Sequence, residues 1–157
     1  MPRWTELIWQ KLGAEADAHV TVDRLGAARA AGGICVALRD LARFGEMVRN
    51  FGRVGDQQIV PRWWIEDILQ NGDQRAWLAT ETAAKFLPAG RYRSQWYMTG
   101  NDSGAYCAIG IHGQWIYVDP KAETVIVKLS SQALPVDEPI DYLLLAAFDA
   151  IANALRS

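Results

Sequence analysis

The sequence predicts an α+β fold in which an antiparallel β-meander packs against a long C-terminal helix and is preceded by a helical segment. Three patterns support this: helical spacing of apolar residues in the first part, a change to period-two alternation at residue 91, and a helical pattern after residue 137. The chain has 157 residues, of which 50% are hydrophobic and 22% charged. That size and balance are typical of one globular domain. We therefore interpret residues 1–157 as a single segment, helical over about 1–88 and sheet plus C-terminal helix over about 89–157.

Helices are predicted at several places in the first part. The first helix follows from four apolar residues at helical spacing, Trp4, Leu7, Ile8 and Leu12, with Gly13 as its end. A loop over residues 14–33 leads to a second helix over 37–50, whose apolar stripe is Leu38, Leu41, Phe44 and Val48. Pro61 fits the first turn of a third helix. A weaker helical pattern spans residues 80–86.

Strands are predicted from residue 91 onward. Residues 91–99 alternate as one strand, with Tyr92, Ser94, Trp96 and Met98 on one face. Residues 106–111, 114–118 and 124–129 predict further strands, and the short turns between them favour antiparallel pairing. Asp137 is expected to cap the final helix. The residues of that helix expected to face the sheet are Tyr142, Leu145, Ala146 and Ile151.

Composition excludes several classes of partner. The 16 basic and 18 acidic residues give a net charge of −2, so the basic excess of a nucleic-acid-binding protein is missing. The longest apolar run, residues 143–148, falls far short of the roughly 20 residues that span a bilayer. Cys35 and Cys107 form no CxxC unit, so we expect free thiols in a reducing compartment and predict a cytoplasmic location. The aromatic residues Trp63, Trp64, Trp77, Trp96 and Trp115 are predicted to lie mostly in the core, with one or two forming a pocket wall.

The sequence lacks the usual signatures of metal, phosphate and nucleophile sites. The chain has two histidines and no HExxH motif, and it has no Gly-rich phosphate loop, so we predict no metal and no cofactor. A Ser-x-x-Lys nucleophile needs its lysine one helical turn after the serine. None of the serines meets this condition: Ser94, Ser103, Ser130, Ser131 and Ser157. Residues 101–105, NDSGA, echo the nucleophile loop of trypsin-like proteases, but a hairpin turn is the preferred interpretation.

Two segments are informative about the family. Residues 31–45 read AGGICVALRDLARFG, and residues 110–120 read GIHGQWIYVDP. In this order they resemble the penicillin-recognising serine hydrolases, which include class C β-lactamases, related esterases and 6-aminohexanoate-dimer hydrolases. The resemblance runs over nearly the whole chain and implies a partial β-lactamase/transpeptidase-like fold. It also implies that this chain lacks part of the catalytic machinery, because the Ser-x-x-Lys nucleophile and the Tyr-containing base element of the family both precede the matched segment. Residues 92–94, Tyr-Arg-Ser, match the base element by chance and come too late in the order.

The same resemblance implies where a substrate would bind. The cation-x-Gly element of the family falls on Ala108, Ile109 and Gly110, with alanine in place of the cation. That replacement argues against recognition of a β-lactam carboxylate and favours an amide or ester. Gly110 has no side chain, so it would let a substrate lie against the strand. The resemblance further implies that the backbone N–H of Ile111 is one of two oxyanion-hole donors, the other belonging to the absent nucleophile.

The next two residues, His112 and Gly113, complete the predicted substrate-binding segment. For His112 two alternatives are open: the imidazole contacts the substrate, or it is turned away and hydrogen-bonded within the sheet.

Three functions are consistent with the sequence. The preferred one is the C-terminal segment of a serine hydrolase that acts on amides or esters and is inactive alone, because an oxyanion donor without a nucleophile has no transition state to stabilise. In the second, an N-terminal half is supplied by another polypeptide, which is then the partner. In the third, the chain is a non-catalytic binding or self-associating module, which would form a homodimer through an exposed sheet edge.

Overall fold

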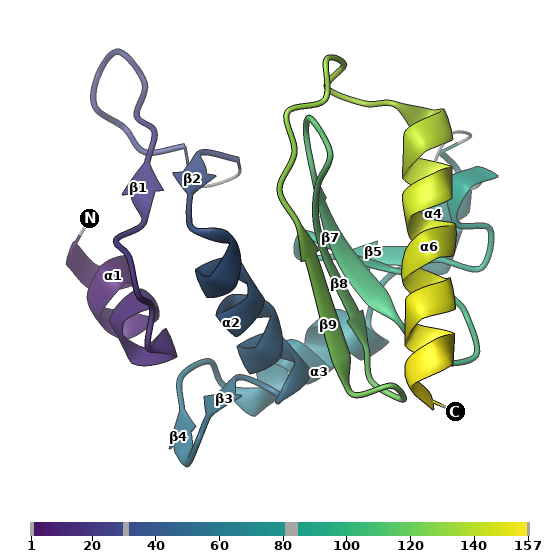
Figure 1. The fold of residues 1–157 in the computed structure, drawn as a ribbon, viewed down its shortest axis with the longest axis horizontal. Helices are drawn as coiled ribbons and strands as arrows, with labels where there is room; N and C mark the ends of the chain where they lie inside the picture. Colours follow the sequence, from purple (N-terminus) through teal and green to yellow (C-terminus); the bar gives the residue numbers. More distant parts are fainter. Residues whose placement is uncertain (1, 30–31, 81–84, 157) are drawn as a thin grey trace.

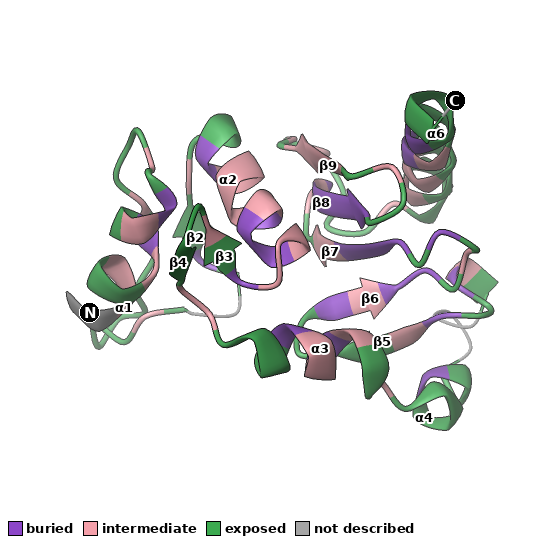
Figure 2. Ribbon diagram, turned by 90° about the horizontal axis from the view of Figure 1, so that it is seen from below, coloured by how far each residue is buried: buried purple, intermediate pink, exposed green. Residues whose placement is uncertain are grey.

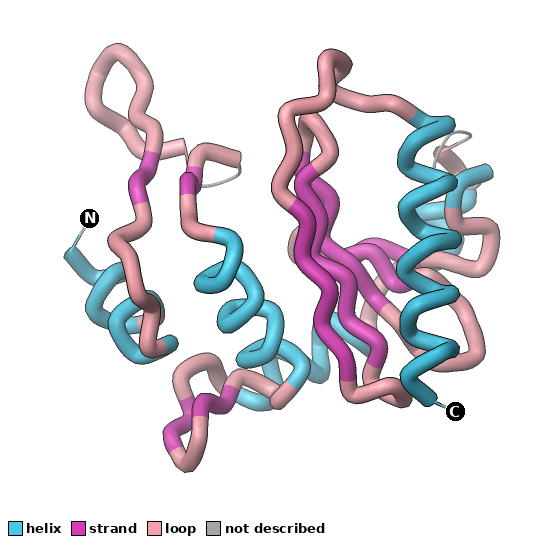
Figure 3. The backbone as a smooth tube through the Cα atoms, viewed as in Figure 1, coloured by secondary structure: helices cyan, strands magenta, loops and turns pink. Residues whose placement is uncertain are grey.

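The computed structural model describes residues 2–29, 32–80 and 85–156 (Figures 1 and 3). The first part contains α1 (Pro2–Leu7), the 3-10 helix η1 (Trp9–Leu12), β1 (His19–Val20), β2 (Ile34–Cys35), α2 (Leu38–Arg49), β3 (Arg53–Val54), β4 (Gln57–Gln58), α3 (Arg62–Gln70) and α4 (Gln74–Leu78). The second part contains β5 (Arg91–Arg93), β6 (Trp96–Met98), β7 (Tyr106–Gly110), β8 (Gln114–Asp119), β9 (Thr124–Lys128) and α6 (Glu138–Arg156). The helix predicted over 80–86 lies largely outside the described residues.

The predicted antiparallel meander is confirmed. The strands β5 to β9 form one five-stranded sheet in sequence order, and every neighbouring pair is antiparallel. The first part is mostly helical, as expected, but it also contains two short antiparallel pairings, β1 with β2 and β3 with β4. The loop predicted over residues 14–33 includes β1.

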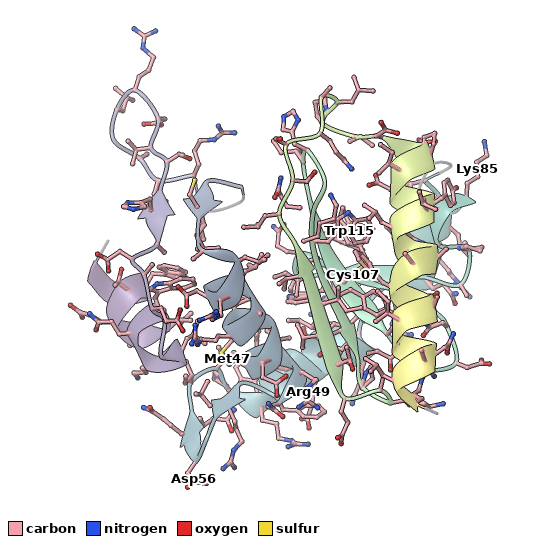
Figure 4. All side chains as sticks on the ribbon, in the orientation of Figure 1. Met47, Arg49, Asp56, Lys85, Cys107 and Trp115 are labelled. Carbon is pink, nitrogen blue, oxygen red and sulfur yellow. The ribbon has the colours of Figure 1, made fainter. Side chains whose placement is uncertain are left out.

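The sheet is covered on both faces, with α2 on one side and α6 on the other (Figure 1). The α2 side carries the larger core, to which η1, α2 and α3 contribute buried residues: Trp9, Leu12, Met47, Val48, Ile65 and Ile68. The α6 side buries Phe148 and Ala152 of the helix against Cys107, Trp115 and Tyr117 of the sheet. Figure 4 shows Cys107 and Trp115 on β7 and β8, near α6.

Residues 91–99 form a hairpin, so the prediction of a single strand was wrong. Ser94 and Gln95 both have positive φ, 48° and 74°. Two such residues in a two-residue connection make the turn whose twist matches a β-hairpin. The turn folds β5 onto β6 and brings Tyr92 opposite Tyr97, on the same face of the sheet. The predicted face, which grouped Tyr92 with Trp96 and Met98, is therefore also wrong.

The final helix begins where predicted but is rotated from the expected face. The side chain of Asp137 accepts a hydrogen bond from the Ile140 backbone N–H at 3.4 Å. Leu145 packs against the α6-side core as predicted, whereas Ala146 is exposed. The other two predicted contacts, Tyr142 and Ile151, are exposed as well. The helix is apolar on more than one side, so periodicity alone does not determine which side meets the sheet.

The tryptophans divide between the surface and the two cores. Trp63 and Trp64 on α3 are exposed rather than buried, and they stack edge to face at 5.7 Å. Trp96 and Trp115 lie in the two cores, as predicted. Within the described part of the chain, none of the helices combines the length and the apolar character required to cross a membrane.

Candidate active site

The strand β7 has an open edge over its last three residues. It pairs with β8 along its whole length, but with β6 only through Tyr97 opposite Cys107 and Met98 opposite Tyr106. Ala108, Ile109 and Gly110 therefore have no partner strand on the β6 side among the described residues. The opening lies within the sheet, beside its central strand, where an extended ligand could lie along the backbone.

The open edge presents backbone polar groups. The Thr99 N–H donates to the Ala105 carbonyl at 3.0 Å, which sets the hydrogen-bonding phase between the two strands. Because successive residues of an antiparallel strand direct their backbone groups to opposite sides, Ala105 and Cys107 face β6. Continuing this alternation directs the N–H and C=O of Ile109 to the open edge.

The turn Ile111–His112–Gly113 connects β7 to β8. Ile111 is 58% exposed. Its backbone N–H has no hydrogen-bond acceptor in the part of the chain that the structure describes. A fixed N–H of this kind is the chemical group that stabilises an oxyanion in acyl transfer.

His112 is hydrogen-bonded within the protein, to the loop after β9 and not within the sheet. Its N–H donates to the Pro135 carbonyl at 3.0 Å, and its own carbonyl accepts from the Gln132 N–H at 3.3 Å. The imidazole Nδ1 lies 2.8 Å from the Gln132 carbonyl oxygen. The residue has φ of 58°, and these three bonds hold it in that conformation.

Gln114 holds the turn from its other end, and sequence reasoning missed it. Its Nε2 donates to the carbonyls of Ser130, at 2.5 Å, and His112, at 3.1 Å, while its Oε1 accepts from the Ser130 N–H at 3.0 Å. Lys128 adds a bond from Nζ to the Gly113 carbonyl at 3.0 Å. Ser130 is 16 residues from Gln114, and Lys128 is 15 residues from Gly113, so no local pattern indicates these bonds.

Both glycines of the turn region lie close to neighbouring side chains. Gly113 has φ of 77°, and a Cβ there would meet the side-chain atoms of Gln132 at 2.4–2.7 Å. A Cβ on Gly110 would lie 3.1 Å from the Cβ of Gln114. The positive φ and the Gln132 side chain therefore disfavour a larger residue at Gly113, whereas a larger residue at Gly110 would require a small shift of Gln114.

The predicted site residues do not all face one side. Ala108 packs against the α2-side core and Ile109 against the α6-side core, as alternation along a strand requires. Gly113 is buried, whereas Gly110 and Ile111 are exposed. The exposed part of the predicted segment is thus Gly110 and Ile111, where β7 ends and the turn begins.

The serines of the NDSGA and Tyr-Arg-Ser segments supply no nucleophile to this turn. Ser103 is buried in the β6–β7 loop, and its Oγ donates to Asn101 Oδ1 at 2.9 Å. The hairpin interpretation of residues 101–105 is therefore correct, and Ser94 belongs to the β5–β6 turn. The described residues also contain no group of three His, Cys, Asp or Glu side chains that could hold a metal ion.

The Beta-lactamase family model matches residues 2–150. The chain belongs to the β-lactamase family. A 6-aminohexanoate-dimer hydrolase from Paenarthrobacter ureafaciens is 42% identical over 124 residues, which are 79% of this chain and 31% of that protein. The chain thus spans about a third of the length of this curated relative.

Solved structures of this family share the fold. A Bacillus anthracis protein proposed to be a 6-aminohexanoate-dimer hydrolase matches with a TM-score of 0.80 and 33% identity, over 96% of this chain and 37% of that one. A Bacteroides dorei protein proposed to be a β-lactamase matches with a TM-score of 0.57 and 18% identity, over 93% of this chain and 50% of that one. The second likeness concerns the fold alone. Together with the antiparallel sheet, these matches identify the chain as part of a β-lactamase-like fold.

Proposed function

We propose that this chain is the portion of a serine hydrolase that supplies one oxyanion-hole donor, the Ile111 N–H, and the strand edge against which a linear amide or ester substrate lies. The nucleophile, its lysine and the tyrosine base come from a second portion of the fold. The observation that carries the proposal is the backbone N–H of Ile111, an exposed residue, which has no acceptor among the described residues and sits in a turn held by hydrogen bonds on both sides.

The fixed turn supports this role. An oxyanion donor is effective when it is already in position, so that no reorganisation occurs as charge develops. The bonds from His112 to Gln132 and Pro135, and from Gln114 to Ser130, provide that rigidity. The opening at Ala108–Gly110 then provides space for the substrate next to the donor.

Hydrolysis by the chain alone is not expected. Neither the sequence nor the described side chains pair a serine hydroxyl with a lysine amine that could take its proton. Without a nucleophile the donor has no tetrahedral intermediate to stabilise.

Linear amides are the substrates that we assign to the completed enzyme. The Paenarthrobacter relative is named for the 6-aminohexanoate dimer, and it is 42% identical over the matched region. Ala108 stands where the resemblance expects a cation, which disfavours a substrate that needs its carboxylate paired there.

Exposed apolar surface supports the second portion as the partner. Along the outer side of α6, Leu143 is 69% exposed and Leu155 is 61% exposed, with Ile151 between them. The strand β9 lies at one end of the sheet order, and its outer edge has no partner strand among the described residues. Surfaces of this kind usually mark an interface.

The test is complementation. The chain is mixed with the part of the Paenarthrobacter enzyme that lies outside the matched region, and hydrolysis of the 6-aminohexanoate dimer is measured with labelling by a fluorophosphonate. We expect turnover and labelling only in the mixture. Turnover or stoichiometric labelling of the chain alone would refute the assignment, and so would a folded complex that hydrolyses neither amides nor esters.

The donor itself is tested by Ile111→Pro, which removes the N–H, against Ile111→Val, which keeps it. Loss of one oxyanion donor lowers kcat by about 10²–10³-fold. We expect that loss for the proline variant and near-normal turnover for valine, with the hydrogen-bonded turn verified by the His112 and Gln132 amide NMR signals. Equal turnover of the two variants would show that another group stabilises the oxyanion.

A further inference from the structure

The two edges of the five-stranded sheet differ in how they are protected. The strands β5 and β9 lie at its two ends (Figure 2). The β5 edge carries Arg91 and Arg93, whose guanidinium groups donate to the Leu69 carbonyl at 2.6 Å and to Asp67 at 2.8 Å. Both acceptors belong to α3, so this edge is charged and tied to a helix. The outer edge of β9 has no partner strand among the described residues.

The middle of β9 lacks the residues that usually protect a sheet edge. Natural edges avoid pairing with other chains through charged side chains, proline or bulges. Residues 125–127 read Val-Ile-Val, and the only charged residue of the strand is Lys128, at its end. The Lys128 Nζ donates to the Gly113 carbonyl at 3.0 Å, so this charge is held by the β7–β8 turn. The centre of the edge is therefore open to another strand.

The backbone groups of Val125 and Val127 point to the open side of β9. Cys107 faces β6, so Tyr117, which lies opposite it on β8, faces away from β7 and toward β9. Ile126 lies opposite Tyr117 and directs its own backbone groups toward β8. Because these directions alternate along a strand, the N–H and C=O groups of the two valines point outward.

The strand β9 is complementary to a second copy of itself. In an antiparallel pairing centred on Ile126, Val125 of one copy lies opposite Val127 of the other, and each such pair exchanges both backbone hydrogen bonds. Ile126 then meets its own equivalent at the two-fold axis, and Lys128 lies opposite the uncharged Thr124. A shift of this register by two residues would place one of the valines opposite a residue outside β9.

A groove leaves room beside this edge on the α2 side of the sheet. Its volume is about 640 Å³, and its lining includes Leu12 of η1, Met47 of α2 and Val125 of β9. Val125 and Val127 both pack on the α2 side. In the antiparallel pairing, the Val127 side chain of the second copy would therefore lie next to Val125, at the border of the groove.

The charges of α6 favour the same arrangement. α6 runs beside β9 in the opposite direction (Figure 1). Its first turn carries Glu138 and Asp141, and its last turn carries Arg156. A two-fold axis through the paired strands places both copies of α6 on one face of the joined sheet, pointing in opposite directions. The acidic start of each helix then lies toward the basic end of the other, which is electrostatically favourable.

We infer that the chain forms a homodimer in which the two β9 strands pair antiparallel and join two five-stranded sheets into one. This inference does not rest on the proposed hydrolase function. The second portion of the hydrolase is proposed to use the same edge, so the dimer and the completed enzyme exclude each other.

The association is tested first on the 157-residue chain alone. Sedimentation velocity over roughly 1–100 µM should show a species of twice 17.5 kDa that dissociates on dilution. Amide hydrogen exchange at Val125 and Val127 should slow as the dimer forms, whereas exchange at Ile126 should be slow throughout. A monomer over the whole range would overturn the inference, and so would a dimer in which both valine amides exchange rapidly.

The role of the edge is tested by Val127→Pro against Val127→Ala. The proline removes an outward N–H that the sheet of one copy does not use, whereas the alanine shortens the same side chain and keeps the N–H. We expect the proline to raise the dimer Kd about tenfold or more and the alanine to raise it less. Circular dichroism verifies the fold, and the exchange measurement on the unaltered chain decides the matter if the proline variant does not fold.

Two results with these variants would contradict the β9 interface. One is an equal loss of dimer for proline and alanine, which would assign the contact to the side chain. The other is a dimer that survives Val127→Pro but is lost in Leu143→Ser, which would place the self-association surface on α6.

The mixture with the remaining part of the Paenarthrobacter enzyme separates this inference from the proposed function. We expect the dimer to be replaced by a complex with one copy of each portion. If the chain dimerises through β9 and no mixture turns over, the hydrolase function fails and the interface stands. If the mixture turns over while the chain alone stays monomeric, the interface fails and the hydrolase function stands.

Discussion

The two faces of the sheet differ in how much of the described chain covers them. On the α2 side, several helices bury a broad core, and the accessible surface of α2 carries charged side chains, with Arg39 74% and Glu46 46% exposed. On the α6 side, the described chain supplies one long helix that buries Phe148 and Ala152. Much of α6 is drawn as exposed in Figure 2. Leu143 and Leu155 are among its exposed residues.

This difference indicates that the outer side of α6 is a candidate interface. A helix that faces water on one side has polar residues there, as α2 does, whereas a helix that is apolar on two sides is usually covered on both. The match covers about a third of the length of the Paenarthrobacter relative. The remaining two thirds of that relative contain chain that could cover the outer side of a helix such as α6. The α2 side holds the larger core of the described chain, and we propose that the α6 face is completed by the rest of the hydrolase.

The largest effect is expected where α6 holds to the sheet. Phe148 is buried and contacts Trp115 and Tyr117 at ring distances of 5.6 Å. Because the single helix has few other buried residues, Phe148→Ala should lower the free energy of unfolding by about 3–5 kcal/mol. Urea unfolding followed by circular dichroism measures this. Ala146→Ser on the exposed side of the same helix is the control, and equal destabilisation of the two variants would contradict the burial of Phe148.

A comparable truncation on the other face should act independently. Met47 of α2 is buried in the α2-side core (Figure 4), and Met47→Ala should cost about 2–5 kcal/mol. The sheet separates Met47 from Phe148, so the effects in the double variant should add within about 0.5 kcal/mol. A coupling well above that value would mean that the two cores respond as one.

The meander and its turns could be predicted because they depend on local residues. A connection as short as residues 120–123 can join two neighbouring strands only if they are antiparallel. The β5–β6 hairpin was missed for an equally local reason. Ser94 and Gln95 adopt positive φ, but they are not the Asn-Gly or Asp-Gly pairs that indicate such a turn, so the alternation on both sides of it suggested a single strand.

The site was predictable only in part, because its support is non-local. The motif GIHG identified the turn through a family resemblance, and the role of the Ile111 N–H as an oxyanion donor stays a prediction. Gln114 looked like an ordinary strand residue, since its partner Ser130 is 16 residues away. A cavity between α4 and the β5–β6 hairpin is lined in part by Tyr92 and Tyr97, on the two sides of a turn that the sequence did not indicate.

Acid should weaken the α2 side through Asp40. Its buried carboxylate accepts the N–H groups of Glu15 and Ala16 and bonds Arg43, and the Glu15 bond is the main cause of a pKa below the usual 3.8. A lowered native pKa stabilises the fold above the unfolded-state value, and this stability is lost as pH falls through the native pKa.

Unfolding curves between pH 5 and pH 2, taken at about one-unit intervals, test this linkage. Wild type should lose stability on acidification below about pH 4, and Asp40→Asn should be less stable at neutral pH but less sensitive to acid. Parallel pH profiles for the two proteins would show that Asp40 does not control the acid response.

At the candidate site the expected change is in rigidity more than in global stability. Gln114→Ala removes the bonds to Ser130 and His112 and should speed amide hydrogen exchange at His112 and Gln132. In the completed hydrolase the same change should lower kcat by about 10–100-fold with little effect on KM, because a displaced donor acts mainly in the transition state. Gln114→Glu keeps an acceptor for the Ser130 N–H, so its kcat should fall less than that of Gln114→Ala. A rise in KM at constant kcat would instead make Gln114 a substrate-binding residue.

The smallest effect on the isolated chain should come from the outer side of α6, where the comparison of the two faces is most sharply tested. Leu143→Ser and Leu155→Ser replace exposed side chains, so each should change the free energy of unfolding by less than about 0.5 kcal/mol. Affinity for the remaining part of the hydrolase should nevertheless fall about tenfold or more, because that partner would bury both leucines. Titration calorimetry measures the affinity, with Trp63→Ser on the exposed surface of α3 as the control. If the leucine variants instead abolish dimerisation of the chain and leave complex formation intact, α6 is a self-association surface and the second portion of the enzyme docks elsewhere.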